Sequence, residues 1–150
     1  MVLRRMYKVG GLVDETDVCL GVYGEDLNPA EVTEMLRRDP SRSHRRGDPM
    51  KSGHLRHKGA WLLSVSGTSD PEELTADLLD RVVAIDESVW ADLANRHDVQ
   101  LRFGLFLNRW NRGLEFSPEL VGRIARIRAR VIFDIYGPDG DVDASDVPRC

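Results

Sequence analysis

Imidazole, guanidinium and ammonium groups are gathered in one segment, Asp39–Trp61, of a chain that is acidic overall. Its histidines (His44, His54 and His57) are suited to acid–base work near neutral pH or to metal binding. Its arginines and lysines are suited to binding phosphate or carboxylate groups. Between residues 37 and 58, eight Lys or Arg stand against two Asp, a local balance of +6 in a chain of net charge −4. The segment is therefore the first candidate for a functional site.

A metal site is the weaker interpretation of these histidines. His54 and His57 are three residues apart, a spacing at which two imidazoles on a helix can share a metal ion. Glycines flank the pair, however, and the segment has no helical pattern. The neighbouring Arg56 and Lys58 would also repel a divalent cation. We expect no metal and no cofactor, and we keep His44, His54 or His57 as an acid or base of a small enzyme only as an alternative.

The rest of the chain offers no stronger catalytic or ligand-binding motif. Ser64 and Ser66 lack the G-x-S-x-G context of a nucleophilic serine. The Gly-Gly pair near the N-terminus forms neither a Walker loop nor a dinucleotide-binding fingerprint. The alternating aspartates after residue 138 lack the glycine and glutamate positions of an EF-hand loop. We therefore expect no catalytic residue set.

The elements that must position the basic segment are predicted from apolar periodicity. Four strands are expected, at Asp17–Gly24, Ala60–Gly67, Val99–Asn108 and Ala129–Gly137. Helices are expected after Asn28-Pro29, Asp70-Pro71 and Ser117-Pro118, where a capping side chain precedes proline, and a shorter helix at Ser88–Asn95. The order β-α-β-α-α-β-α-β predicts an α+β fold that resembles a ferredoxin-like arrangement. It would be a four-stranded, mostly antiparallel sheet with helices packed mainly on one face.

Composition and length indicate one globular domain. Residues 1–15 are expected to be a flexible leader, 16–137 a single α+β domain, and 138–150 an acidic mobile tail. No apolar run approaches the roughly 20 residues that cross a bilayer, and no signal peptide is evident, so we expect a cytoplasmic protein without a membrane partner. The strand order and the oligomeric state are open, and a homo-oligomer joined through an edge strand is one possibility.

The basic segment itself is predicted to be a loop of about 20 residues, and loops of that length are usually functional or disordered. A solvated loop, an acidic protein partner, nucleic acid and a small anion are the alternatives. Nucleic acid is disfavoured because no aromatic side chain lies between residues 42 and 58 to stack on bases. We favour a noncatalytic interaction domain that recognises an acidic protein surface. The candidate binding residues in the loop are Arg42, Arg45, Arg46, Lys51, Arg56 and Lys58.

Phe106 and Trp110 offer a second possibility at the end of the third predicted strand. Aromatic residues with Arg109 and Arg112 nearby are typical of interface hot spots. They are also ordinary core residues beneath a covering helix, which is the interpretation that we favour. Trp110 is kept as a further candidate for partner binding.

Several short motifs together resemble the domain-of-unknown-function 4279 family over roughly residues 16–137. They are a helix ending in leucine, a Pro-Ser segment leading to Gly-Asp, a strand bearing tryptophan, and a Ser-Pro-Glu-Leu helix before a strand ending in Asp-x-Tyr. The positions are Leu36, Pro40, Ser41, Gly47, Asp48, Trp61, Ser117, Pro118, Glu119, Leu120, Asp134 and Tyr136. Arg37 stands where the family has glycine after the leucine. The resemblance implies no known activity; some similar small bacterial domains are thought to act near toxin systems as immunity proteins, which makes an immunity role a lead.

Overall fold

The computed structural model describes residues 10–82 and 86–138, which form five strands and four helices. The strands are β1 (Glu15–Gly24), β2 (Arg42–His44), β3 (Gly59–Gly67), β4 (Asp98–Phe106) and β5 (Arg130–Tyr136). The helices are α2 (Pro29–Leu36), α3 (Pro71–Asp80), α4 (Glu87–Arg96) and α5 (Pro118–Arg126). This is the expected order of elements with one strand added after the first helix.

The strands form one mixed sheet in the order β2-β3-β1-β4-β5. β1 lies at its centre and pairs antiparallel with β3 and β4, β2 pairs antiparallel with β3, and β4 and β5 are parallel. The α+β class is confirmed, but the expected number of four strands is corrected to five. The additional strand, β2, has no apolar alternation of its own. Its extended form comes from pairing with β3, where Ser43 lies opposite Trp61.

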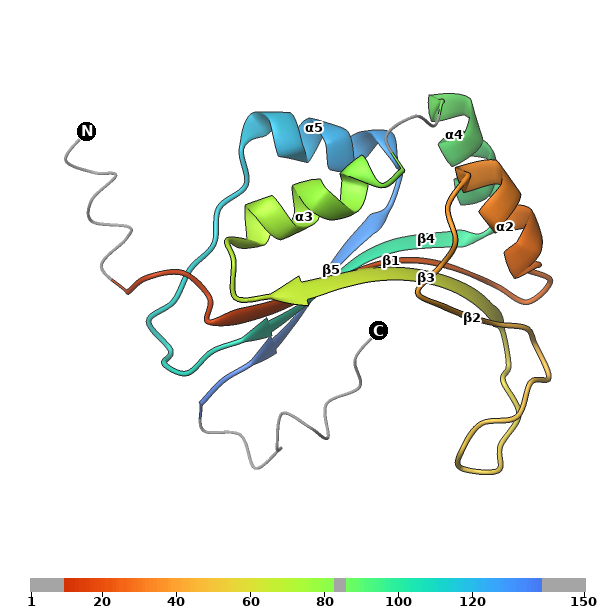
Figure 1. Cartoon of the computed structure of the whole chain (residues 1–150), viewed down its shortest axis with the longest axis horizontal. Helices are drawn as coiled ribbons and strands as arrows, with labels where there is room; N and C mark the ends of the chain where they lie inside the picture. Colours follow the sequence, from red (N-terminus) through yellow and green to blue (C-terminus); the bar gives the residue numbers. More distant parts are fainter. Residues whose placement is uncertain (1–9, 83–85, 139–150) are drawn as a thin grey trace.

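Three helices begin where a capping residue precedes a proline, as predicted. The side chains of Asn28, Asp70 and Ser117 each accept a hydrogen bond from an N–H of the first helical turn, at 3.2, 2.9 and 3.2 Å. Proline fits the first helical position because its φ is preset and it has no N–H that would lack a partner there. All four helices lie on one face of the sheet (Figure 1). None of the helices within the described ranges is long and apolar enough to cross a membrane.

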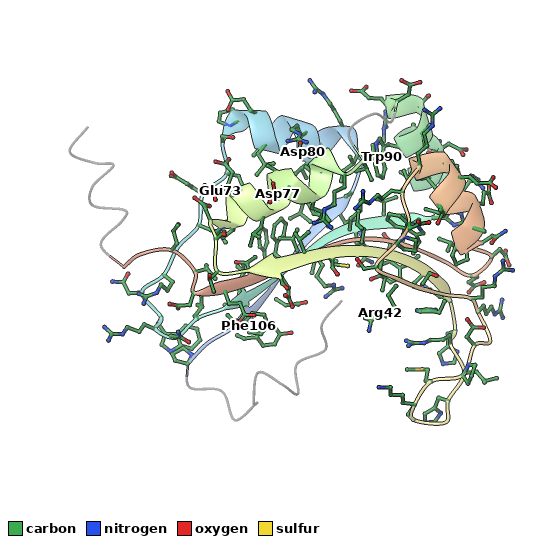
Figure 2. All side chains as sticks on the ribbon, in the orientation of Figure 1. Arg42, Glu73, Asp77, Asp80, Trp90 and Phe106 are labelled. Atoms are coloured by element: carbon green, nitrogen blue, oxygen red, sulfur yellow. The ribbon has the colours of Figure 1, made fainter. Side chains whose placement is uncertain are left out.

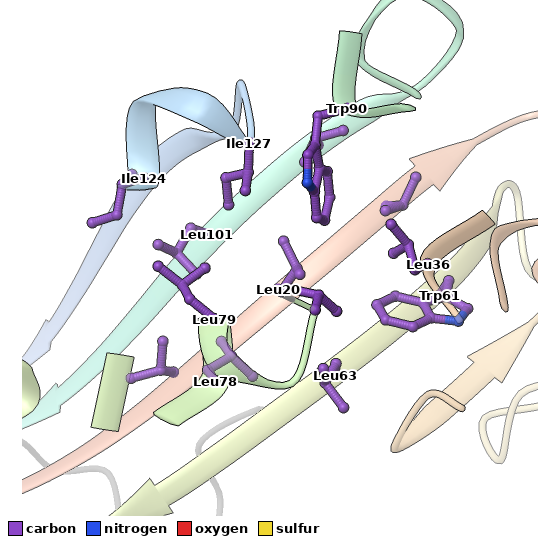
Figure 3. Packing of buried hydrophobic residues seen from close by; sticks show 14 of the residues in the cluster. Leu20, Leu36, Trp61, Leu63, Leu78, Leu79, Trp90, Leu101, Ile124 and Ile127 are labelled. Atoms are coloured by element: carbon purple, nitrogen blue, oxygen red, sulfur yellow. The ribbon is translucent and has the colours of Figure 1, made fainter. Parts of the chain in front are cut away.

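The core lies between these helices and alternate residues of the three central strands. Leu20 of β1 and Leu101 of β4 are inaccessible to solvent and lie beneath the helices (Figure 3). Trp61 of β3 is also fully buried, and its indole N–H donates a hydrogen bond to Thr33 Oγ1 of α2 at 3.1 Å. The bond orients α2 at the edge of the sheet from which the basic segment leaves.

Residues 10–14 lie against the connection between β4 and α5. The carboxylate of Asp14 accepts a hydrogen bond from the Asn108 N–H at 2.7 Å and forms an ion pair with Arg112 Nε at 3.2 Å. The bond from Asn108 is the main cause that lowers the pKa of Asp14, and Arg112 adds to it. Residues 1–9 of the expected leader and 139–150 of the expected tail lie outside the described residues, so those boundaries stay predictions.

Thr16 places a hydroxyl group in the core without a hydrogen-bond partner among the described residues. A methyl group in its place avoids the cost of burying that hydroxyl, so Thr16→Val is expected to raise the free energy of unfolding by about 1 kcal/mol. Urea denaturation followed by circular dichroism measures the change. Thr75 is the matched control, because it is equally buried but donates to the Pro71 carbonyl at 2.6 Å. Thr75→Val should not stabilise the protein, and a loss of stability in Thr16→Val would contradict the prediction.

Candidate functional site

The basic segment is an ordered excursion from one edge of the sheet, and we call residues 42–58 the basic hairpin. It begins as β2, leaves the sheet after His44, and rejoins it where β3 starts at Gly59. In Figure 1 it extends below the sheet at the right-hand end. The expectation of a loop without regular structure is therefore corrected, since the segment contains a strand and a hydrogen-bonded hairpin.

Main-chain hydrogen bonds fold the basic hairpin back on itself. The Gly47 N–H donates to the Arg56 carbonyl, and the Arg56 N–H donates to the Asp48 carbonyl, both at 2.8 Å. Gly53, near the tip, has a φ of 86°, a left-handed conformation that glycine adopts without steric cost. The cationic side chains are thus carried by a main chain of defined shape.

Arg45 and Arg46 lie at the base of the hairpin, next to the start of α2. Arg45 Nη2 donates to Asn28 Oδ1 at 2.8 Å, and this same oxygen caps α2. The Arg45 main-chain N–H donates to the carboxylate of Asp48 at 2.7 Å. The one carboxylate in the hairpin thus accepts a hydrogen bond from the main chain of the hairpin. Arg46 approaches Glu25 at 3.9 Å, with both side chains largely exposed. Such a pair contributes little stability, and the charge of Arg46 stays open to a partner.

The other four cationic residues are spread along the hairpin. Arg42 lies on the sheet face opposite the helices (Figure 2), Lys51 is near the tip, and Lys58 directly precedes β3; all three are exposed. Arg56 is half-buried in the middle of the hairpin. The six predicted residues therefore share one hairpin, and five of them are exposed on it.

Phe106 and Trp110 lie at the opposite end of the sheet. β1 pairs with Phe106 at one end and with Gly59, next to the hairpin, at the other. The favoured interpretation as core residues under a helix is wrong. Trp110 is 60% exposed, and Phe106 lies on the face without helices (Figure 2), where it stacks on Tyr136 with ring centroids 5.0 Å apart. The structure thus does not bring Trp110 to the basic hairpin.

His44 is half-buried, whereas His54 and His57 are exposed on the hairpin. Burial, followed by the charge of Arg56, lowers the pKa of His44 and favours the neutral ring. One ring nitrogen bonds to the Lys58 main chain, and the buried Nδ1 has no hydrogen-bond partner among the described residues. No carboxylate is therefore hydrogen-bonded to Nδ1, as an oriented acid–base pair would require.

A hollow of about 590 Å³ lies between α2 and the base of the hairpin. Arg45 contributes a guanidinium to its lining, and Glu34 and Asp48 contribute carboxylates. This mixture of charges does not select one class of anionic ligand. The exposed outer surface of the hairpin, which carries one sign of charge, is the stronger candidate for recognition.

Two ion pairs on the sheet face opposite the helices were not found from the sequence. Arg102 pairs with Asp134, and Arg130 pairs with Asp98, both at 2.7 Å, joining β4 to β5. The hydrogen bond from Arg130 is the main cause that lowers the pKa of Asp98. The alternation of β4 predicts that Arg102 lies on the polar face. That Asp134 is its partner follows only from the position of β5 beside β4.

The comparison with family models agrees with the fold and with the sequence resemblance. A family model described as Domain of unknown function (DUF4279) matches residues 14–138, a range that includes all nine helices and strands described above. No curated protein and no solved structure matches the chain. Because the family model covers most of the sequence, the chain belongs to the DUF4279 family of domains of unknown function.

Proposed function

We propose that the domain is a noncatalytic interaction module that recognises an acidic protein surface through the basic hairpin. The observation that carries the proposal is the combination of charge and order in residues 42–58. Six Lys or Arg and one Asp stand on a main chain that hydrogen bonds hold in one shape. A preordered surface loses less conformational entropy on binding than a mobile loop would, so more of the electrostatic attraction appears as affinity.

An apolar side chain in the hairpin favours a protein partner over nucleic acid. Leu55 is 58% exposed and lies beside Arg56, and its main chain forms a bridge with Pro49. An exposed leucine on a hairpin that carries cationic residues offers the kind of apolar contact found at the centre of protein interfaces. Single-stranded nucleic acid binding would instead call for aromatic rings on which bases stack. The exposed Trp110 lies at the other end of the sheet.

The enzyme alternative has less support. His44 is the one hairpin histidine that the fold encloses, and its ring bonds to main chain on one side only. His54 and His57 are exposed. A general acid or base needs a positioned ring and a substrate pocket, and the hollow beside His44 is lined by charges of both signs.

An affinity-capture experiment with a matched control tests the proposal. In the hairpin variant Arg42, Arg46, Lys51 and Lys58 are each replaced by glutamine; Arg45 is kept because it bonds to the cap of α2. In the control variant, four arginines outside the basic hairpin are replaced by glutamine: Arg81, Arg109, Arg126 and Arg128. Both variants lose four positive charges, and circular dichroism checks that both remain folded.

Nuclease-treated lysate of the source cells is passed over each immobilised protein at 50 and 300 mM NaCl. We expect at least one acidic protein to be retained by the wild type and the control at 50 mM NaCl, and to be depleted about tenfold or more on the hairpin variant and at 300 mM NaCl. If all three proteins retain the same set, the hairpin is not the recognition surface. Proteins retained from untreated lysate in a parallel run but absent after nuclease treatment would favour the nucleic-acid alternative.

An immunity role is one specific form of this function, and it rests on the family resemblance. The acidic partner would then be a toxin encoded beside this protein. Co-expression of the adjacent gene with the wild type, the hairpin variant and the control distinguishes the possibilities. Protection of the cells by the wild type and the control but not by the hairpin variant is the result that this role requires.

A further inference from the structure

β5 is an edge strand whose apolar residues are exposed. Val131, Phe133 and Ile135 alternate along it on the same side as the helices, and they are 41, 46 and 59% exposed. Phe133 stacks on the buried Phe103 of β4, with ring centroids 5.1 Å apart, so the strand is anchored beneath while its outer surface remains accessible. Three apolar side chains on one edge strand indicate a surface that another element could cover.

The main chain of the same three residues faces the free edge of the sheet. The Tyr136 carbonyl accepts a hydrogen bond from the Leu107 N–H on the β4 side. Main-chain groups of alternate residues in a strand point to opposite sides, so the N–H and C=O groups of Val131, Phe133 and Ile135 point away from β4. Within the described residues no strand pairs with this edge. The apolar residues are thus also the ones that can extend the sheet.

β5 lacks the features that usually keep an edge strand from pairing with another copy. It has seven residues and contains neither proline nor lysine. Its two charged residues, Arg130 and Asp134, lie on the face without helices and are held by Asp98 and Arg102 of β4. Neither charge lies among the apolar side chains, where it would oppose association.

We propose that β5 pairs antiparallel with β5 of a second copy, about a two-fold axis at Phe133. This register places Val131 opposite Ile135 of the second copy and Phe133 opposite its own equivalent. It uses all three free main-chain residues and makes about six inter-copy hydrogen bonds. The result is one continuous sheet across both copies, with a basic hairpin at each far end.

Apolar pairing selects this register over an axis at Ile132, which would place Arg130 opposite Asp134 but pair Ile135 with Ala129, outside β5; charge selects it over an axis at Asp134. With the axis at Phe133, Arg130 and Asp134 are both diagonal to Asp134 of the second copy, and of the two only Arg130 carries a side chain long enough to reach that carboxylate. Arg130 uses Nε and Nη2 for Asp98, which leaves its other amino group for the second copy. An axis at Asp134 would instead place two carboxylates directly opposite each other, which is destabilising.

The dimer is expected to be weak, so its detection requires a high protein concentration. Three half-exposed apolar side chains present roughly 250 Å², well below the about 800 Å² that each partner buries in a standard interface. We therefore expect a dissociation constant in the micromolar range, and measurements have to reach about 500 µM.

Sedimentation velocity of the full chain from about 5 to 500 µM tests the association. Ile135→Lys places two ammonium groups in the interface and should raise the dissociation constant at least about tenfold. Leu55→Lys is the matched control, because Leu55 is 58% exposed on the basic hairpin and lies far from β5; it should dimerise as the wild type does. A monomer at 500 µM, or unchanged dimerisation of Ile135→Lys, would overturn the proposal.

Amide hydrogen exchange followed by NMR tests the register. Protection of the Val131, Phe133 and Ile135 amides should increase with protein concentration, because only the second copy binds them. The amides of Ile132, Asp134 and Tyr136 already face β4, so their protection should not depend on concentration. Concentration-dependent protection elsewhere with none at these three amides would refute pairing through β5. The dimer is independent of hairpin recognition, so either proposal can fail alone.

Discussion

Trp61→Ala is expected to lower the free energy of unfolding by about 4 kcal/mol. Trp61 is fully buried between β3 and α2 and lies beside Leu36 and Leu63 in the core (Figure 3). Removal of the indole leaves a cavity that these neighbours can fill only in part, and it leaves Thr33 Oγ1 without its donor. Urea denaturation monitored by circular dichroism gives the difference in unfolding free energy.

Two controls separate the parts of this effect. Trp61→Phe keeps an aromatic ring but lacks the N–H group, so it should cost less than half as much as alanine. Thr33→Val keeps the volume but removes the acceptor, which leaves the indole N–H unsatisfied at a cost of about 1 kcal/mol. If Trp61→Ala costs no more than Thr33→Val, the packing of α2 on β3 is looser than the structure shows.

Gly59→Ala is expected to destabilise the protein by about 2 kcal/mol. A Cβ at this position would lie 2.7 Å from the Leu27 carbonyl oxygen and 3.2 Å from the Leu27 Cβ. The carbonyl belongs to the main chain between β1 and α2, so it cannot move aside without shifting the hairpin junction or the start of the helix. Thermal and urea denaturation both measure the expected loss.

Gly67 at the other end of β3 provides the matched comparison. There a new Cβ would meet Leu74 Cδ2 at 3.6 Å, an ordinary contact. Gly67→Ala should therefore change stability by less than about 0.5 kcal/mol, or raise it slightly by restricting the unfolded chain. Equal effects at the two glycines would show that the close approach of Leu27 is not limiting.

Local signals in the sequence were sufficient for most of the elements. Asn28, Asp70 and Ser117 each cap a helix, because a side-chain oxygen followed by proline acts within one turn and needs no tertiary partner. β1 and β4 show the alternation that their two different faces impose. β2 could not be predicted in this way, because its strand state depends on β3, which begins fifteen residues after His44.

The candidate site was predictable in composition but not in shape. The run of arginine, lysine and histidine in residues 42–58 indicated the charge, while the main-chain bonds that order the hairpin join residues across it and follow no short pattern. Trp110 was grouped with these residues by chemistry alone, and the register of β1 places it at the other end of the sheet. The exposure of Val131 and Ile135 on β5 likewise required the strand order, since their alternation resembles that of a buried strand.

The three-residue length of β2 limits how many molecules can join. In the proposed dimer the two copies pair through β5, so the two edge strands of the combined sheet are both β2. As an edge strand, β2 offers a third molecule only three residues for main-chain pairing. Pro40 precedes these residues, and after His44 the chain leaves the sheet. Association should therefore end at a closed pair, with no growth into fibrils.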